Sequence, residues 1–207
     1  MAKKLTIKKP DKKLNDFGVF DIETIIIDGT HVPYCASYLD NKISFTYYIS
    51  DNENLTIEQR KFLLLDQFFD KVIEVALGRY VFAHNFSKFD GFYLLEYFMR
   101  KVNEQKIKRN DFVVIMSTEG NSKIYSIEYK QKRKSVNFRD WYLLISESLQ
   151  SLASLLNDPN LKKTIFPYEF LRENPSNLFY KGIKPDLKYF LSQEEIKIND
   201  KVYQIPL

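Results

Sequence analysis

FGVFDIETIIIDG, residues 17–29, combines the apolar composition of a buried strand with two carboxylates, Asp21 and Glu23, in its middle. Residues two apart on a strand point to the same face, so these carboxylates stand side by side while Ile22 faces the other way. Like charges this close, with apolar neighbours, are costly unless a partner offsets them. A divalent cation is such a partner, because oxygen-only ligands suit Mg²⁺ or Mn²⁺. The alternative is that both acids lie at a strand edge, exposed or paired with lysines.

The sequence around this strand predicts an α/β domain. Further strands are expected at 32–40, 42–50, 79–85, 111–118, 122–130 and 134–141, and helices at 55–78, 89–102 and 147–158. Thr56 and Gln59 form a capping box for the first helix, which Gly78 ends. The third helix is expected to turn Leu149, Leu152, Ala153 and Leu156 inward. Beyond about residue 164 the chain is expected to be packed but mostly irregular. This order predicts a mixed central sheet flanked by helices, and an RNase H-like layout fits it.

A second polar group follows the strand expected at 79–85. His84 and Asn85 end that strand, and Asp90 begins the next helix. Sites in α/β sheets lie at the carboxyl ends of strands, so Asp90 can complete a metal site begun on the first strand. Two metals about 3.5–4 Å apart, held by such acids, suit phosphodiester cleavage. The alternative for Asp90 is a plain helix N-cap, and the alternative for His84 is a satisfied buried histidine.

Composition limits the classes of protein. The 207 residues, 44% hydrophobic and 28% charged, indicate one globular domain, and a net charge of +4 permits a polyanionic partner. Cys35 is the single cysteine, which excludes an internal disulfide and a cysteine-based metal site. No apolar run reaches about 18 residues, so no membrane span or membrane partner is expected. The lysine-rich residues 1–14 are expected to be either a solvated terminus or a phosphate-contacting arm.

FDIET (20–24), followed about 65 residues later by HNFSKFDGFYLL (84–95), resembles the first two exonuclease motifs of protein-primed family B DNA polymerases. These enzymes occur in phages, linear plasmids and fungal or plant mitochondria. FRDWYLLISESLQSLASLL (138–156) and the stretch from Lys163 to Phe190 are similar to the segments that follow in the family. The resemblance covers roughly residues 15–192. It implies an RNase H-like fold of the DEDD exonuclease type.

The resemblance also implies an activity, the 3′–5′ proofreading hydrolysis of 3′-terminal phosphodiesters of DNA by a two-metal mechanism. Asp21 and Glu23 would bind two Mg²⁺ or Mn²⁺ ions, and Asp90 would bind a metal mainly through water. Lys163 and Tyr168 would support the scissile phosphate, although Tyr168 could also be a core residue. The residues implied in contacts with the single-stranded 3′ end are Thr24, His84, Asn85 and Phe89. Trp141 stands where the family has serine, and it either stacks on a base or packs in the core.

The family's third motif, Tyr-x3-Asp, is not found in the chain, because Ile196 and not tyrosine precedes Asp200 by four residues. We therefore expect a Lys-rich arm (1–14), an exonuclease-like domain (15–192) and a tail without the third motif (193–207), as a fragment of a longer polymerase. The parent's partners would be a polymerase domain and a priming terminal protein. Its location would be a mitochondrion, with an organelle or plasmid gene, or alternatively the host cytoplasm of a virus or phage. The alternative function is a catalytically inactive remnant that binds single-stranded nucleic acid.

Overall fold

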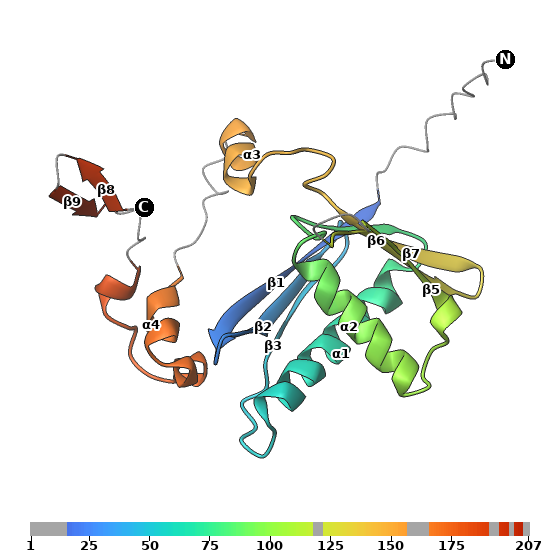
Figure 1. Ribbon diagram of the computed structural model, residues 1–207, viewed down its shortest axis with the longest axis horizontal. Helices are drawn as coiled ribbons and strands as arrows, with labels where there is room; N and C mark the ends of the chain where they lie inside the picture. The colour runs from blue at the N-terminus through green and yellow to red at the C-terminus, as the bar shows by residue number, and fades with distance from the viewer. Residues whose placement is uncertain (1–15, 118–121, 157–165, 191–194, 199–200, 205–207) are drawn as a thin grey trace. The chain divides into compact units, whose positions relative to one another are not determined.

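The computed structural model describes residues 16–117, 122–156, 166–190, 195–198 and 201–204 (Figure 1). The strands are β1 (Phe17–Ile27), β2 (Thr30–Leu39), β3 (Ser44–Tyr48), β4 (Tyr80–Ala83), β5 (Phe112–Met116), β6 (Ile124–Gln131), β7 (Lys134–Asp140), β8 (Glu195–Ile198) and β9 (Lys201–Gln204). The helices are α1 (Ile57–Ala76), α2 (Asp90–Asn103), α3 (Leu149–Leu156) and α4 (Tyr168–Glu173), with 3-10 turns η1 (Arg109–Asp111), η2 (Pro175–Phe179) and η3 (Leu187–Phe190).

The main sheet is mixed, with the strand order β3-β2-β1-β4-β7-β6-β5. Strands β1, β4 and β7 run parallel, whereas β5, β6 and β7 form antiparallel pairs. A two-residue turn joins β1 to β2, and both its residues have positive φ (Asp28 50°, Gly29 75°), as the tightest hairpin turns require. A meander beside parallel strands is the RNase H-like arrangement, so the predicted fold class is confirmed.

The chain forms two compact units, which are described one at a time. Unit 1 contains the described residues of 1–20, 38–45 and 69–141, and unit 2 contains those of 21–37, 46–68 and 142–207. The boundary passes through β1, so that Phe20 belongs to unit 1 and Asp21 to unit 2.

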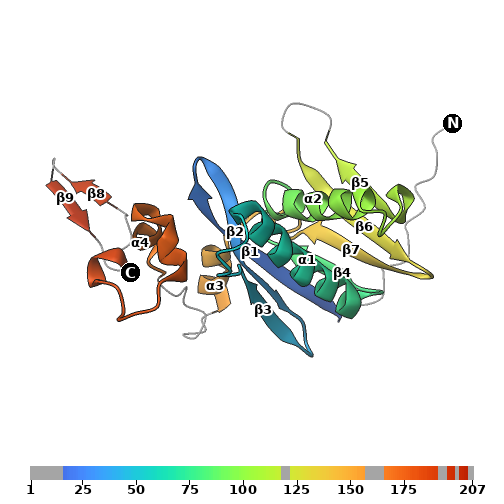
Figure 2. The same ribbon diagram turned by 90° about the horizontal axis from the view of Figure 1, so that it is seen from below.

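The core of unit 1 lies between its strands, α2 and residues 69–76 of α1, and Figures 1 and 2 show the two helices at an angle to each other. Register places Phe138 of β7 opposite Val81 of β4 and Ile127 of β6, and all three are fully buried. On α2, Phe98 stacks on Phe112 and Tyr129, with ring centroids 4.9 and 5.2 Å apart. Aromatic contacts of this kind add to the free energy gained by burial.

A polar bridge joins the two helices of unit 1. Asp70 of α1 accepts hydrogen bonds from the Tyr97 hydroxyl at 2.5 Å and from Lys101 Nζ at 3.1 Å, both on α2. Lys101 is only 6% exposed, so this partner offsets the cost of burying its charge. The bridge fixes how the helices lie on the sheet.

Unit 2 contains the second half of β1 and the irregular segments expected after residue 164. There, Phe170 of α4 packs on Tyr180 and Tyr189 at 5.2 and 5.1 Å, and the Tyr189 hydroxyl donates to Glu173 at 2.6 Å. The expectation of little regular structure is met, with short α4, η2 and η3 inside the segment. The expectation of a packed segment is not met throughout, since Ile183 and Leu187 are 88% and 71% exposed. Strands β8 and β9 pair as an antiparallel hairpin. None of the helices described here has both the length and the apolar composition to cross a membrane.

The sequence signals for the two ends of α1 agree with the structure. The side-chain orientation predicted for the third helix, α3, does not. The Thr56 backbone donates to the Gln59 side chain at 2.9 Å and the Gln59 backbone to Thr56 Oγ1 at 3.2 Å, which completes the predicted capping box. Gly78 has φ 92° just past the end of α1. The inward orientation predicted for Leu149 is wrong, since this side chain is 58% exposed. An apolar stripe indicates a face suited to burial but does not say whether another element covers it.

Candidate active site

The two carboxylates of β1 belong to unit 2 and occupy the same side of the strand. Ile22 is 3% exposed and anchors the strand, whereas Asp21 is exposed and Glu23 is partly exposed. This alternation is what the two-residue period of a strand predicts. The carboxylates are thus held by a rigid element and remain accessible to a ligand.

Tyr168 of α4 reaches Glu23 from a distant part of the sequence. Its hydroxyl donates a hydrogen bond to Glu23 Oε2 at 3.4 Å, across 145 residues of chain. Phe166 packs edge-on against Tyr168 at 5.0 Å and stacks on Tyr34 at 6.0 Å. Within unit 2 the structure therefore brings together three of the predicted site residues, Asp21, Glu23 and Tyr168.

The electrostatics of this group are dominated by its negative charge. Burial, and then the Glu23 carboxylate, raise the pKa of both Tyr34 and Tyr168 above the ordinary 10.0, and Asp21 adds to the effect. Burial raises the pKa of the Cys35 thiol too, and Glu23 and Asp21 act in the same direction. Tyr34 and Cys35 were not predicted as neighbours of the carboxylates. The sequence contains no local signal that shows which residues of β2 lie next to Asp21 and Glu23. A negative potential beside two accessible carboxylates is suited to a cation.

The raised pKa of Tyr34 predicts how the free energy of unfolding depends on pH. Below pH 10 the phenols are protonated whether the chain is folded or not, whereas above it the unfolded chain ionises first because folding raises the pKa of Tyr34. The free energy of unfolding should therefore fall above pH 10, until the folded phenol also ionises. We expect Tyr34→Phe to show a shallower fall than the wild type between pH 9 and 11, as measured by urea unfolding. Equal slopes for the two proteins would contradict the raised pKa.

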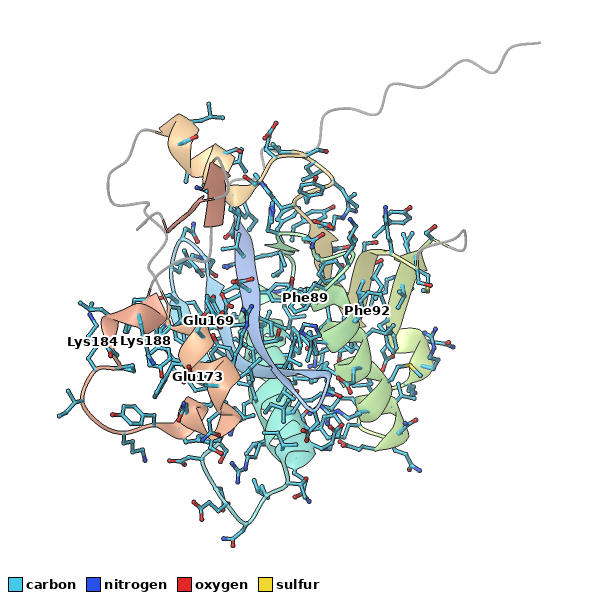
Figure 3. All side chains as sticks on the ribbon, turned by 60° about the vertical axis from the view of Figure 1, so that its left-hand side comes forward. Phe89, Phe92, Glu169, Glu173, Lys184 and Lys188 are labelled. Atoms are coloured by element: carbon cyan, nitrogen blue, oxygen red, sulfur yellow. The ribbon has the colours of Figure 1, made fainter. Side chains whose placement is uncertain are left out.

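Asp90 belongs to unit 1, where it is the first residue of α2 and only 2% exposed. The alternative that Asp90 is the helix N-cap is wrong, because that position is taken by Phe89, with φ −137° and ψ −82° (Figure 3). The turn before α2 is tight: the Gly91 N–H donates to the Phe86 carbonyl at 2.9 Å, and a Cβ on Gly91 would lie 2.7 Å from the same oxygen. Glycine is therefore required beside Asp90.

The carboxyl ends of β4 and β7 lie next to each other in unit 1, with Ala83 paired to Asp140. β4 ends at Ala83, so His84 and Asn85 lie in the following turn and not in the strand as predicted; Asn85 has φ 63°. Asp140 is 2% exposed and accepts a hydrogen bond from the Ser87 N–H at 2.9 Å. Sequence reasoning did not select Asp140, although its place at the end of an expected strand was a signal.

Comparison with known proteins places the chain in a family. The family model described as "DNA polymerase type B, organellar and viral" matches residues 76–205. The chain belongs to this family. It is 29% identical over 113 residues to a probable DNA polymerase of Neurospora intermedia and 24% identical over 198 residues to one of Ascobolus immersus. These alignments cover 55% and 95% of this chain.

The chain spans only 11% and 15% of the lengths of these two type B relatives. Among solved structures, it is similar to phi29 DNA polymerase complexed with primer-template DNA and incoming nucleotide (TM-score 0.49, 18% identity, 68% of this chain and 23% of that one). It is also similar to phi29 DNA polymerase complexed with single-stranded DNA (TM-score 0.49, 19% identity, 73% and 25%).

The remaining residues that the type B resemblance singles out have contacts inside the protein. Trp141, which is half-buried, stacks on Phe17 at 6.3 Å and packs edge-on against Phe82 at 5.5 Å. Phe89 packs on Tyr93 at 5.6 Å, and Thr24 Oγ1 lies 3.3 Å from His31 Nδ1. Lys163, the arm 1–14 and Asp200 lie outside the described residues.

The donor set of β1 fits a hard divalent cation. Across the described residues, no group of three or more His, Cys, Asp or Glu side chains is placed to hold a metal by itself. Mg²⁺ is nevertheless commonly held by one or two carboxylates, with water and substrate phosphates as its other ligands. Asp21 and Glu23 supply two carboxylates of this kind, of which Asp21 is exposed and Glu23 is partly exposed.

Proposed function

We propose that this chain is the 3′–5′ exonuclease domain of a protein-primed type B DNA polymerase and hydrolyses the 3′-terminal phosphodiesters of single-stranded DNA. The observation that carries the proposal is the placement of two accessible carboxylates, Asp21 and Glu23, with the Tyr168 hydroxyl hydrogen-bonded to Glu23. Membership of a DNA polymerase family makes a polynucleotide the natural substrate. Acids beside a phenol suit hydrolysis of a phosphate ester, in which negative charge gathers on oxygen.

In the proposed reaction, Asp21 and Glu23 hold Mg²⁺ or Mn²⁺, and Asp90 contributes a third carboxylate. The bound ions supply positive charge to the attacking water and to the leaving 3′ oxygen. A phenol keeps its proton at neutral pH, and burial and the neighbouring carboxylates raise the pKa of Tyr168 further. Its single hydroxyl proton, which is donated to Glu23 in this structure, would be donated instead to a phosphate oxygen when the substrate binds. Lys163 is proposed to neutralise that phosphate.

The contacts with the 3′-terminal nucleotides are assigned, as part of the proposal, to Thr24, His84, Asn85 and Phe89, with Trp141 as a further stacking residue. In the parent enzyme the domain would proofread for a polymerase domain that starts from a priming terminal protein. We propose a mitochondrial location, with an organelle or plasmid gene, and the host cytoplasm of a virus as the alternative.

The deciding experiment measures release of 3′ nucleotides from a 5′-labelled single-stranded DNA in Mn²⁺ or Mg²⁺. We expect Asp21→Asn to lower the rate by more than about 100-fold, since even outer partners of metal ligands cost about 10- to 100-fold. Asp28→Asn is the matched control, because Asp28 is an exposed acid at the far end of β1 and asparagine tolerates its φ of 50°. Its rate should stay within about twofold of wild type. If the wild-type chain binds the oligonucleotide but releases no nucleotide, the exonuclease proposal fails. The alternative of a catalytically inactive remnant that binds single-stranded nucleic acid then holds.

A further inference from the structure

The turn between β6 and β7 displays a dense group of cations. The last pair of the ladder joins Gln131 to Lys134, so Lys132 and Arg133 form a two-residue turn. Lys132 has φ 56°, a conformation for which asparagine or glycine is favoured over lysine. We name the turn and its flanking cations the basic hairpin, and all of its members are exposed: Lys130, Lys132, Arg133 and Lys134.

The charge of the basic hairpin is not balanced from within the described chain. Lys130 lies 3.8 Å from Glu128, but no carboxylate in the described part of the molecule pairs with Lys132, Arg133 or Lys134. Other lysines of unit 1 do have carboxylate partners, such as Lys71 with Glu74 at 3.0 Å and Lys106 with Glu104 at 2.8 Å. Like charges held together by a tight turn repel one another. The arrangement is therefore unfavourable by itself and suits an external polyanion.

The basic hairpin lies at the opposite end of β7 from Asp140. In Figure 2 the turn is at the end of the sheet where β4 begins, as the pairing of Tyr80 with Asn137 requires. At about 3.3 Å per residue, β7 separates the turn from Asp140 by on the order of 20 Å, or about six nucleotide steps of a duplex. Between them Arg139 is exposed and lies 4.9 Å from the centre of the Tyr80 ring, which extends the positive charge along the strand.

We propose that Lys132, Arg133 and Lys134 form a further nucleic-acid contact in unit 1, which binds the phosphate backbone at the end of β7 opposite Asp140. Flexible lysines at a turn act as point charges, so the contact is to phosphate and carries no base preference. Membership of a DNA polymerase family favours nucleic acid over other polyanions. Binding at Lys132, Arg133 and Lys134 does not require hydrolysis. A chain that binds DNA without cleaving it would still make this contact.

The test compares two variants of the 207-residue chain, each of which removes two positive charges. Lys132→Asn with Arg133→Gln removes unpaired charges, and asparagine suits the φ of residue 132, so folding is retained. The control, Lys71→Gln with Lys106→Gln, removes charges already paired with Glu74 and Glu104. Binding of a fluorescent 20-nucleotide single strand and of the matching duplex is measured by anisotropy over a salt series, in EDTA so that nothing is hydrolysed.

Each lost phosphate contact should reduce the slope of log K against log[salt] by about 0.7 for the single strand and about 0.9 for the duplex. The hairpin variant should therefore lose about 1.4 and 1.8 in slope, and about three- to tenfold in affinity at moderate salt. The control should keep the wild-type slope. Unchanged slopes in the hairpin variant, or equal losses in both variants, would overturn the proposal. The proposal would also be overturned if the hairpin variant bound DNA as wild type does but lost binding to phosphatidylserine vesicles. Release of 3′ nucleotides in Mn²⁺ is measured separately, so failure of the hydrolytic proposal, on which the identity of the polyanion partly rests, would be distinguished from failure of this one.

Discussion

Glu23→Gln is expected to lower the rate of 3′-nucleotide release by more than about 100-fold, since it removes the charge from a proposed metal-holding carboxylate while keeping its shape. Glu23 is also the acceptor for Tyr168, so the change acts on both the proposed cation and the phenol. The measurement is the single-turnover rate on a 5′-labelled single strand in saturating Mn²⁺. Glu169→Gln is the matched control, because Glu169 follows Tyr168 on α4 but pairs with Arg172 (Figure 3). Its rate should be unchanged.

A second readout separates this role from simple loss of folding. The Glu23 carboxylate helps to raise the pKa of Tyr168, after burial, so its removal should lower that pKa toward 10.0. Tyrosinate absorbance during an alkaline titration would show Tyr168 and Tyr34 ionising at lower pH in Glu23→Gln than in wild type, because Glu23 raises the pKa of both. Tyr168→Phe should reduce the difference between the two titrations to the part that comes from Tyr34. A variant that retains its rate within a few-fold would refute the assigned role of Glu23, whatever the titration shows.

Much of the fold could be predicted because its signals are local. The alternation around Ile22, the capping box of α1 and the glycine at position 78 each depend on residues a few positions apart, where strand and helix periods act directly. The two-residue turn between β1 and β2 follows from Asp28 and Gly29 in the same way.

The rest of the candidate site depends on contacts between distant parts of the sequence. Tyr168 lies 145 residues from its acceptor, Glu23, and only the resemblance selected it. The burial of Asp140 depends on the pairing of β7 with β4 and on the turn that brings the Ser87 N–H to it. The periodicity of residues within one segment does not specify which residues of another segment lie beside it. These neighbours can therefore be identified only in the folded chain.

The errors have physical causes as well. Aspartate is a residue type favoured at N-caps, but Phe89 occupies the N-cap position. Asp90 therefore lies inside the first turn of α2. His84 and Asn85 leave the strand because Asn85 adopts φ 63°, which a ladder cannot continue. In both places backbone geometry overrides what side-chain type suggests, and both places flank the residues assigned to the proposed reaction.

Phe98→Ala is expected to lower the free energy of unfolding by about 3–5 kcal/mol, the range for deletion of a buried aromatic ring. Phe98 is 0% exposed and stacks on both Phe112 and Tyr129, so its loss leaves a cavity between α2 and the sheet of unit 1. A domain is typically stable by about 5–15 kcal/mol, so this change removes a large share. Urea unfolding followed by circular dichroism measures it.

Phe92→Ala on the same helix is the matched control. Phe92 is 40% exposed, so removal of its ring takes little apolar area from the interior and should cost less than about 1 kcal/mol (Figure 3). Phe98→Leu should lie between the two, because leucine refills part of the cavity. If Phe98→Ala and Phe92→Ala unfolded at the same urea concentration, α2 could not pack on β5 and β6 as described. The turn that carries Asp90 would then lose the support of the core, since it leads directly into that helix.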